Sequence, residues 1–368
     1  MYLEKINRGL FMTLKFVCPQ VSGNGGTETV LTAVINHLVK EKHKVQLILT
    51  NQPTNKQWLT TFNGDVVIKM FQGHGRVNRA LYLVHEFMRS SGTDHYIILG
   101  ANLIKIAAAV RKVFRKKYSI TSWIHYTLIG QTMFNPRNLL LADNHWAISS
   151  SIKEQLIEMG VSPEKIELIF NPVENYDGPL NCPVNDNELR LVFVGHIQLD
   201  KQKNLRELLD AIAKYPGDIH VDFLGATDDL AECQQYAKQL GVTEKLTWHS
   251  WTSDPWRLVI QKIHPNAVIL TSKYEGLPMV FLEGLMRGIP CITARFPGYS
   301  DIVTDGVNGE SYPQGNITEL VATLKKLNAE QLDAKSIAQT ADKFNAVQYF
   351  KRVDRAVRHF RGESNVKQ

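Results

Sequence analysis

The chain has 368 residues, of which 44% are hydrophobic and 21% charged, and its formal net charge is +6. This length predicts two domains, and the composition is ordinary for a globular protein with full cores. No apolar run reaches the length of a transmembrane helix, and the first eleven residues lack the apolar core of a secretory signal, so membrane-spanning and secreted classes are not expected.

The four cysteines, Cys18, Cys182, Cys233 and Cys291, are widely spaced and form no C-x-x-C pair. Three of them lie in apolar or strand-like surroundings. Neither a metal site nor a disulfide framework is therefore expected, and a reducing cytoplasm fits this cysteine usage.

Apolar runs typical of buried strands alternate with helix-period stretches through the first half of the chain. Strands are predicted at 14–21, 45–50, 66–71, 96–99, 120–124, 146–148 and 166–170. Helices are predicted at 27–40, near 77–90, near 102–116 and near 150–160. This alternation predicts a parallel sheet covered by helices.

Residues 174–189 are rich in Pro, Gly, Asn and Asp, which indicates a linker. A second α/β series follows it. Strands are predicted at 190–195, 220–225, 245–248 and 267–272, and helices over most of 317–361. The chain thus reads as two α/β domains joined near its middle.

A basic stretch without any acid runs from His95 to Ala142. Its densest part contains Arg111, Lys112, Arg115, Lys116 and Lys117. A solvated helix face is one interpretation. We favour a surface that meets an anionic membrane or an anionic acceptor, because the complete absence of acids is unusual for a solvated helix. Nucleic acid is not expected, since no helix-turn-helix, zinc-finger or RNP-like pattern accompanies the charge.

Two glutamates, Glu275 and Glu283, stand eight positions apart after a predicted buried strand. Pro278 suits the first turn of a helix, and the helix is predicted to run from Met279 to Arg287 before Gly288-Ile-Pro290 ends it. Glu275 would then lie in the loop at the carboxyl end of a strand, where ligands bind in open α/β sheets. The helix start offers free N–H groups to a phosphate.

A glycine-rich loop, Gly23-Asn-Gly-Gly26, follows the first predicted strand and precedes a helix. Glycines there allow close approach of a ligand to the backbone. The loop is neither a Walker loop nor a full G-x-G-x-x-G motif, so by itself it is also compatible with an ordinary strand–helix turn.

Several motifs, in this order, resemble the retaining glycosyltransferases of family 4. They are Val21-Ser-Gly-Asn-Gly-Gly-Thr-Glu-Thr29, Trp146-Ala-Ile-Ser-Ser-Ser-Ile-Lys-Glu-Gln155, Thr247-Trp-His-Ser-Trp-Thr-Ser-Asp-Pro-Trp256 and the run from Thr271 to Glu310 that contains both glutamates. Within the family, the chain is most similar to bacterial lipopolysaccharide 1,6-galactosyltransferases. The resemblance covers roughly residues 14 to 360.

This resemblance implies a GT-B fold: two Rossmann-like α/β domains that face an interdomain cleft. The first, acceptor-side domain would comprise 12–173, with 345–368 crossing back to it. The second, nucleotide-sugar-binding domain would comprise 190–344, with 174–189 as the linker.

The resemblance also implies roles for individual residues. Gly25 and Gly26 would lie against the donor diphosphate and sugar, with Glu28 nearby. Lys203 matches a family lysine that contacts the diphosphate. His196 replaces the arginine usual in the family, so one fixed cationic contact is lost or becomes pH-dependent, and Lys201 could compensate.

Other candidates lie around the same donor. Gly225, in Gly225-Ala-Thr227, resembles the turn beside the ribose and base, and Trp251 would stack on the base, whereas Trp248 and Trp256 are expected in the core. Glu283 would accept hydrogen bonds from ribose hydroxyls. The sugar and diphosphate would be held by Glu275 and by the backbone of Gly276, Leu277, Pro278 and Met279. His125 would face the reacting sugar, with His145 as the alternative.

No D-x-D pair stands at a predicted strand end, and Asp177 and Asp228-Asp229 are isolated. A metal-independent reaction without a cofactor is therefore expected, with a UDP-sugar as co-substrate. Lys203 and helix N-termini would stabilise the leaving diphosphate.

The first hypothesis is a retaining hexosyltransferase. It would move galactose or glucose from a UDP-sugar to a glycan or glycolipid acceptor such as lipopolysaccharide core, at the inner face of the cell membrane. One alternative is transfer of N-acetylglucosamine to a protein, teichoic acid or polysaccharide. Others are a GT-B-like epimerase or phosphorylase, or a non-catalytic nucleotide-sugar-binding protein. Product analysis with UDP-sugars separates them.

Overall fold

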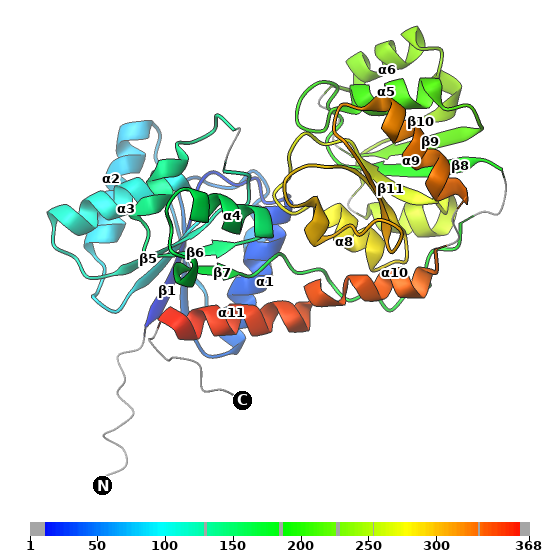
Figure 1. The fold of residues 1–368 in the computed structure, drawn as a ribbon. Coiled ribbons are helices and arrows are strands. Elements are labelled where there is room, and N and C mark those ends of the chain that lie inside the picture. The colour runs from blue at the N-terminus through cyan, green and yellow to red at the C-terminus, as the bar shows by residue number, and fades with distance from the viewer. Residues whose placement is uncertain are drawn as a thin grey trace. The chain divides into compact units, whose positions relative to one another are not determined.

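A computed structural model describes residues 12–128, 131–183, 187–225, 229–252, 254–329 and 332–360. The chain divides into two compact units (Figure 1). The first comprises Met1–Asn171 and Tyr349–Gln368, and the second comprises Pro172–Gln348. The described residues exclude residues 1–11, residues 184–186 of the predicted linker, residues 226–228, which include part of the predicted Gly225-Ala-Thr227 turn, and residues 361–368 at the end of the last predicted helix.

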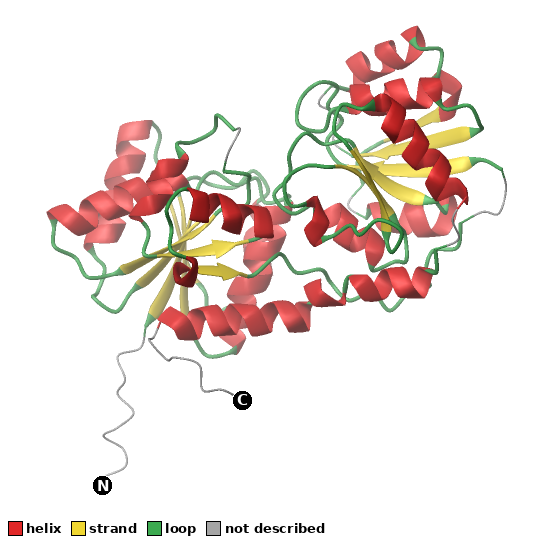
Figure 2. Cartoon of the chain, in the orientation of Figure 1, coloured by secondary structure: helices red, strands yellow, loops and turns green. Residues whose placement is uncertain are grey.

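The first unit contains a parallel sheet of seven described strands in the order β3-β2-β1-β4-β5-β6-β7. The strands are β1 (Thr13–Cys18), β2 (Lys44–Leu49), β3 (Val67–Met70), β4 (His95–Ile98), β5 (Ser119–Trp123), β6 (Asn144–Ala147) and β7 (Ile166–Leu168). Helices flank this sheet (Figure 2). Leu14, Phe16 and Val17 of β1 are fully buried because both faces of the sheet are covered.

The helices of the first unit follow the predicted alternation. They are α1 (Gly26–Lys40), α2 (Arg76–Met88), α3 (Ala101–Val113) and α4 (Ser150–Glu158), with the 3-10 turns η1 (Lys56–Thr61), η2 (Pro136–Leu141) and η3 (Pro163–Lys165). Ser149 caps α4 by accepting a hydrogen bond from the backbone N–H of Ile152 at 3.3 Å.

The last helix, α11 (Ala346–Phe360), packs on the first unit over most of its length. His37 of α1 bonds to Asp354 at 2.8 Å and stacks on Phe350 at 4.1 Å between ring centroids. Arg352 donates to the Ile169 carbonyl at 3.1 Å. These contacts join the end of the chain to elements that precede it by more than 180 residues.

The second unit contains a parallel sheet of six described strands in the order β10-β9-β8-β11-β12-β13. The strands are β8 (Leu189–Val194), β9 (Ile219–Leu224), β10 (Leu246–His249), β11 (Ala267–Leu270), β12 (Cys291–Ala294) and β13 (Gly309–Tyr312). The sequence did not predict β12 and β13. Each has four residues, and β13 contains Glu310 and Ser311, so neither carries a long apolar run.

The helices of the second unit cover its sheet on both sides (Figure 2). They are α5 (Leu205–Lys214), α6 (Leu230–Gln239), α7 (Pro255–Leu258), α8 (Met279–Leu285), α9 (Ile317–Ala329) and α10 (Ala334–Thr340), with the short turns η4 (Thr243–Lys245), η5 (Val259–Ile263), η6 (Tyr299–Asp301) and η7 (Asp342–Phe344). The predicted helix from Met279 ends at Leu285, two residues earlier than expected.

The start of the predicted linker is attached to the second unit. Asn181 is buried, donates its backbone N–H to the Arg287 carbonyl at 2.8 Å and donates its side-chain amide to the Pro265 carbonyl at 2.8 Å. The ring of Tyr176 lies 4.4 Å from the Arg287 guanidinium. The segment therefore follows the surface of this unit.

Each sheet has one point where the strand order reverses. In the first unit β1 pairs with both β2 and β4, and in the second β8 pairs with both β9 and β11. The loops that leave neighbouring strands at such a point diverge to opposite faces of the sheet. Ligands of open α/β sheets bind in the resulting crevice at the carboxyl ends of the strands.

Candidate functional site

A cavity of about 180 Å³ lies at the carboxyl ends of β8, β9 and β10 in the second unit. Three residues singled out from the sequence, His196, Gly225 and Trp251, line it together. The other lining residues are Val194, Gly195, Leu224, Thr252 and Pro255. Residues that lie up to 61 positions apart in the chain thus meet at one edge of the sheet.

Two glycines form the floor of this cavity by direct backbone contact. A Cβ atom built on Gly225 would lie 1.8 Å from the Gly195 carbonyl oxygen, so no other residue fits there without parting the two strand ends. The Gly195 N–H bonds to the Leu224 carbonyl at 2.9 Å. The glycine that the sequence analysis placed beside a ribose is therefore required by close packing.

The three tryptophans of the 248–256 region have different surroundings. Trp251 is 62% exposed at the cavity, so a face of its indole is accessible to a ring-shaped ligand. Trp248 stacks on Phe223 at 4.2 Å, and Trp256 is buried. The structure leaves Trp251 in a position where an aromatic ligand could stack.

Lys203 and Glu275 meet across the point where the strand order reverses. Their side chains form an ion pair at 2.7 Å and are only 14% and 9% exposed. The other oxygen of Glu275 accepts a hydrogen bond from Gln202 at 3.3 Å. Because both partners are largely desolvated, each holds the other in place, and loss of either would leave an uncompensated charge.

Lys201, which the sequence suggested could compensate for the missing arginine, lies in the loop after β8, and that role stays a prediction. Its ammonium forms an ion pair with Asp229 at 2.7 Å, and Asp229 also accepts the Leu199 N–H at 3.3 Å. These contacts fix the loop after β8.

Glu283 lies on α8, where burial raises the pKa of its carboxyl group against the opposing effects of Trp256 and Arg287. The indole N–H of Trp256 donates to Oε2 at 2.6 Å. Arg287 donates to the Glu283 carbonyl at 2.8 Å, and its guanidinium lies 4.9 Å from the Trp256 ring. Trp256 thus orients Glu283, a role that the sequence analysis missed because nothing in the local pattern links positions 27 apart.

The residues between the two glutamates lead into α8. Pro278 occupies the position before the first helical residue, Met279, and Leu277 is buried. Gly276 follows Glu275 in the same loop. Their roles in holding a sugar and a diphosphate stay predictions.

A second cavity, of about 330 Å³, lies at the carboxyl ends of β1, β4 and β5 in the first unit. It brings together Gly25, Gly26 and His125, three of the residues singled out from the sequence. The remaining lining residues are Pro19, Gln20, Val21, Ser22, Thr27, Glu28, Leu99 and Tyr126.

Glu28 organises the glycine-rich loop at this cavity. Its Oε1 accepts hydrogen bonds from the Ser22 N–H at 2.8 Å, the Ser22 hydroxyl at 2.8 Å and the Gly23 N–H at 3.0 Å. A Cβ atom on Gly25 would lie 2.6 Å from the other oxygen, Oε2. Glu28 is therefore more than a first-turn residue: its carboxylate closes the loop, and Gly25 is a glycine because that carboxylate fills the adjacent space.

His125 reaches the same cavity with a neutral ring. Burial lowers its pKa to about 3, so the imidazole is uncharged at ordinary pH. Its Nε2 is buried, and no group in the described part of the chain bonds to it. A neutral imidazole nitrogen can donate or accept a hydrogen bond, depending on its tautomer. The alternative candidate, His145, is buried in β6 with its Nδ1 2.7 Å from the Ser122 hydroxyl.

The five basic residues proposed as a surface do not all behave alike. Lys112, Arg115 and Lys117 are exposed. Arg111 instead forms an ion pair with Asp143 and donates to the Leu141 carbonyl at 3.3 Å. Lys116 donates to a backbone carbonyl, that of Ser90, at 3.3 Å. Arg111 and Lys116 therefore make hydrogen bonds within the first unit. Asp143, just beyond the acid-free stretch, accepts from Arg111, and the Ser90 carbonyl accepts from Lys116.

The described residues contain no group of three or more His, Cys, Asp and Glu side chains placed to hold a metal ion. No described helix is both long and apolar enough to cross a membrane.

Comparison with known proteins identifies the family. Residues 182–344 match the family described as glycosyl transferases group 1. The chain is 30% identical over 361 residues to the lipopolysaccharide 1,6-galactosyltransferase of Salmonella typhimurium and 31% identical over 353 residues to that of Escherichia coli. In both cases the match covers 94% of this chain and 98% of the relative.

Solved structures agree with this assignment. The lipopolysaccharide outer core galactosyltransferase WaaB superposes with a TM-score of 0.84 at 30% identity, covering 95% of this chain and 99% of that one. HepE from Anabaena, solved in complex with UDP, superposes with a TM-score of 0.73 at 17% identity, covering 95% and 100% of the two chains, which supports the fold alone. With its two parallel-sheet units and its glutamate pair, the chain belongs to the group 1 glycosyltransferases and has their GT-B fold.

Proposed function

We propose that the protein transfers a hexose, with galactose as the first candidate, from a UDP-sugar to a sugar hydroxyl of a lipopolysaccharide core. The observation that carries this proposal is similarity at 30–31% identity, over 94% of the chain, to two proteins named lipopolysaccharide 1,6-galactosyltransferase. HepE, a protein of the same fold, was crystallised with UDP and glucose, which supports a uridine diphosphate donor.

The cavity of the second unit, which Trp251 lines, and the loops after β8 and β11, which hold Lys203 and Glu275, carry groups suited to such a donor, with Glu283 on α8. Trp251 stacks on the uracil, the carboxylate of Glu283 accepts hydrogen bonds from the ribose hydroxyls, and Lys203 neutralises the diphosphate. Glu275, held by Lys203 at 2.7 Å, accepts hydrogen bonds from the sugar hydroxyls. The protein thereby orients the donor and stabilises the charge that develops on the leaving group.

The transfer step proceeds with retention of configuration. The acceptor hydroxyl attacks the anomeric carbon on the face from which the diphosphate departs. The bond between that carbon and the diphosphate oxygen breaks, and the hydroxyl proton passes to the leaving phosphate oxygen. His125, neutral in the cavity of the first unit, exchanges a hydrogen bond with a sugar hydroxyl. No metal ion takes part, and Lys203 carries the charge stabilisation.

The acceptor's location suggests where the enzyme works. A lipopolysaccharide core is attached to lipid, so the protein acts in the cytoplasm at the inner face of the cell membrane. The exposed basic residues Lys112, Arg115 and Lys117 contribute electrostatic attraction to anionic lipid or to an anionic acceptor.

The test is a panel of UDP- and GDP-sugars, with product mass and anomeric configuration determined for a delipidated core oligosaccharide acceptor. We expect an α-linked hexose from UDP-galactose or UDP-glucose, and activity that is lost in Lys203→Ala but kept in the matched surface variant Lys214→Ala. Turnover with GDP-sugars alone would contradict the donor class. A β-linked product would contradict retention, and binding of UDP without any turnover would indicate a non-catalytic protein.

A further inference from the structure

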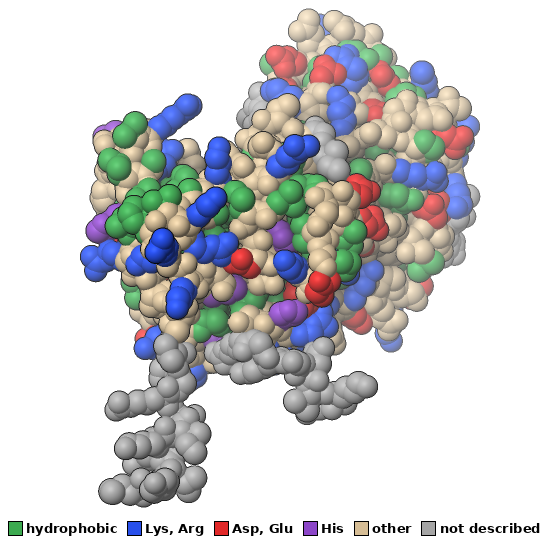
Figure 3. Space-filling model, turned by 60° about the vertical axis from the view of Figure 1, so that its left-hand side comes forward, with side chains coloured by type: hydrophobic (Ala, Val, Ile, Leu, Met, Phe, Trp, Pro, Cys, Tyr) green, Lys and Arg blue, Asp and Glu red, His purple; other side chains and the backbone are tan. Residues whose placement is uncertain are grey.

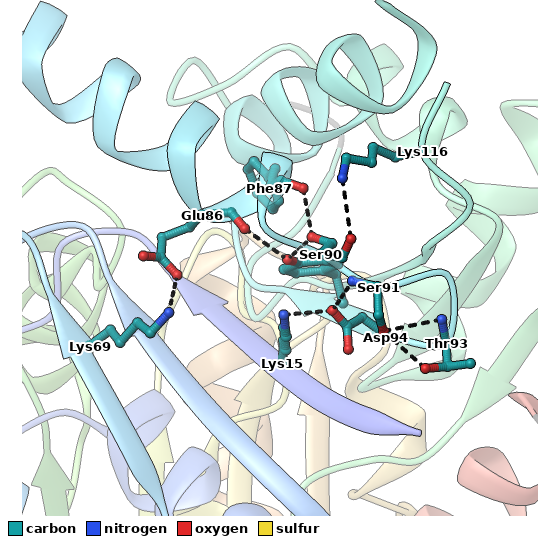
Figure 4. Close-up of polar contacts among 10 residues, drawn as sticks. Lys15, Lys69, Glu86, Phe87, Ser90, Ser91, Thr93, Asp94 and Lys116 are labelled. Carbon is teal, nitrogen blue, oxygen red and sulfur yellow. Dashed lines mark hydrogen bonds and ion pairs between the residues drawn. The ribbon is translucent and has the colours of Figure 1, made fainter. Parts of the chain in front are cut away.

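Arg287, just after the end of α8, is a half-buried cation that has no carboxylate partner. Many Lys and Arg side chains of the chain lie on the molecular surface, where water solvates them (Figure 3). In the first unit, Lys15 pairs directly with the buried Asp94 at 2.6 Å and Lys69 with the buried Glu86 at 2.5 Å (Figure 4). Arg287 forms no ion pair with any described residue. Other contacts must therefore offset the loss of water around its charge.

Two aromatic rings hold the Arg287 guanidinium. Its central carbon lies 4.4 Å from the centroid of the Tyr176 ring and 4.9 Å from that of the Trp256 ring. The negative face of an aromatic ring attracts a cation, and this attraction is stronger where water is excluded. One guanidinium nitrogen, Nη1, also donates to the Glu283 carbonyl at 2.8 Å. Arg287 is thus fixed by contacts from three segments: the linker, α7 and α8.

A tight turn of the linker sets the position of Tyr176. Its hydroxyl donates to the Pro179 carbonyl at 3.0 Å, and a Cβ atom built on Gly178 would lie 2.5 Å from Cζ of the tyrosine ring. A glycine is therefore needed for the turn to close over this ring. Asn181 follows and donates its backbone N–H to the Arg287 carbonyl at 2.8 Å. The linker thus contacts Arg287 at both its guanidinium and its backbone.

The carboxylate of Glu283 lies beside this arrangement. Its Oε2 accepts the Trp256 indole N–H at 2.6 Å, whereas Oε1 accepts no hydrogen bond from a described residue and is left for a ligand. Burial raises the pKa of this carboxyl group, and Trp256 and Arg287 oppose the shift because both favour the ionised form. The like charge of Glu174, in the linker, disfavours that form. The neighbouring segments thus act on the charge of Glu283 in opposite directions.

The charged and titratable groups around this carboxylate come from the same three segments. They are Arg287 after α8, Glu174 and Tyr176 in the linker, and Asp254 before α7. Asp254 and Tyr176 act on the Arg287 guanidinium, whose positive charge they favour. Arg287 is therefore the single cation of this set, and its removal would leave the carboxylate with acidic neighbours only.

We propose that Arg287 is a positioning residue of the donor site. Together with Trp256 it keeps the Glu283 carboxylate oriented and negatively charged for the hydroxyl groups of the nucleotide, and the ring of Tyr176 keeps Arg287 in place. The inference rests on the proposed function for the role of Glu283, and it deepens that function by giving the linker a part in donor affinity. An ionised carboxylate accepts hydrogen bonds at both oxygens, and a protonated one loses part of that capacity. An arginine that only packed the linker would affect stability but not the pH at which the donor binds.

The test is calorimetric titration with UDP between pH 8 and pH 5.5. The readout is the ratio of the variant and wild-type dissociation constants, in which titration of the UDP phosphate, with a second pKa of about 6, cancels. Arg287→Met keeps an apolar stem but removes the charge, so Glu283 takes up a proton at higher pH. We expect the ratio to rise as the pH falls, by up to about tenfold for a shift of one pKa unit. Glu174→Gln should move the ratio below one, because Glu283 then stays ionised to lower pH.

Matched variants separate charge and stacking from packing. Arg257→Met removes an exposed arginine next to Trp256 on α7 and should bind UDP as the wild type does at every pH. Tyr176→Phe keeps the ring and should keep the UDP affinity, whereas Tyr176→Leu removes the cation–π contact and should weaken UDP binding by about threefold to tenfold. Arg287→Lys retains the charge and should keep the wild-type pH dependence, with a lower affinity because lysine lacks the planar group.

The outcomes separate this inference from the proposed function. A ratio that does not depend on pH for Arg287→Met and Glu174→Gln would overturn the inference, even where both variants bind UDP weakly. If Arg287→Met does not fold, Glu174→Gln still decides, since Glu174 is exposed and a ratio of one at low pH would contradict the inference. The expected shifts without any transfer to the core oligosaccharide would support the inference and overturn the proposed function. Transfer by an enzyme whose variants show no pH-dependent ratio would do the reverse.

Discussion

The contact between Gly25 and the Glu28 carboxylate predicts that Gly25→Ala lowers both the stability and the activity of the protein. An alanine at position 25 would place its Cβ 2.6 Å from Glu28 Oε2, well inside van der Waals contact. The backbone there is extended, with φ −95° and ψ 167°, so an alanine is not strained by its own conformation. The carboxylate must therefore move, and it cannot do so without disturbing the three hydrogen bonds that Oε1 accepts from Ser22 and Gly23.

The size of the effect follows from those three bonds. Hydrogen bonds to charged groups contribute roughly 1.5–3 kcal/mol each, but the loop is only partly buried and water replaces some of what is lost. We expect Gly25→Ala to lower the free energy of unfolding by about 2–3 kcal/mol. It should also lower kcat/KM, because the loop lines the cavity that contains His125.

A double-mutant cycle tests the mechanism directly. Glu28→Ala removes the same three bonds and also removes the oxygen with which the added methyl group at position 25 would clash. Once Glu28 is absent, Gly25→Ala should cost less than about 0.5 kcal/mol, as expected for a substitution that no longer has a partner. Urea unfolding of the four proteins and their kcat/KM values provide the measurement. An equal cost of Gly25→Ala in both backgrounds would refute the proposed contact.

Three further predictions concern the donor site, metal and pH. Glu283→Ala should weaken UDP binding by about 1.5–3 kcal/mol in calorimetric titration, and Trp256→Phe, which removes only the N–H that orients this carboxylate, by less. Transfer in EDTA should match transfer with Mg²⁺. The first unit should lose stability as the pH falls below 6.5. Burial lowers the pKa of His95 and His125 to about 3 and that of His145 to about 4, so the unfolded chain binds protons that the folded one does not. Each of the three contributes up to about 1.4 kcal/mol per pH unit, measured as the unfolding free energy at pH 7 and pH 5.

Each of these predictions has a result that would contradict it. Unchanged UDP affinity in a folded Glu283→Ala variant would remove this residue from the donor site. Loss of activity in EDTA that Mn²⁺ restores would show that the reaction needs a metal. For the pH dependence, His95→Asn is the informative variant, since it should flatten the fall in stability between pH 7 and pH 5. An unchanged slope would mean that this histidine does not contribute.

The sequence by itself determined the fold class and the positions of the site loops. The strand before Glu275 is a continuous apolar run, and β1 and β8 are apolar apart from Thr13, Lys15 and Arg190; such runs are encoded by neighbouring residues. The glycine-rich loop after β1 and the glutamate pair after β11 could be placed at carboxyl strand ends for the same reason. The family motifs then added residue roles that periodicity cannot supply. The strand β13 was missed because its four residues, Gly309 to Tyr312, include Glu310 and Ser311 and carry no apolar pattern.

Only the tertiary structure decided which side chains meet. Trp256 bonds to Glu283 across 27 positions, and Arg111 is neutralised by Asp143 across 32. These contacts depend on how helices and loops pack on the sheet. The sequence around either residue does not predict them. The same holds for Glu86 and Asp94, which are buried and pair with Lys69 and Lys15, so that residues 66–142 expose no acid. Composition gives the number of charges in a segment. Burial and pairing determine which of those charges a binding partner encounters, because a charge that is neutralised inside the fold contributes little to the electrostatic potential at the surface.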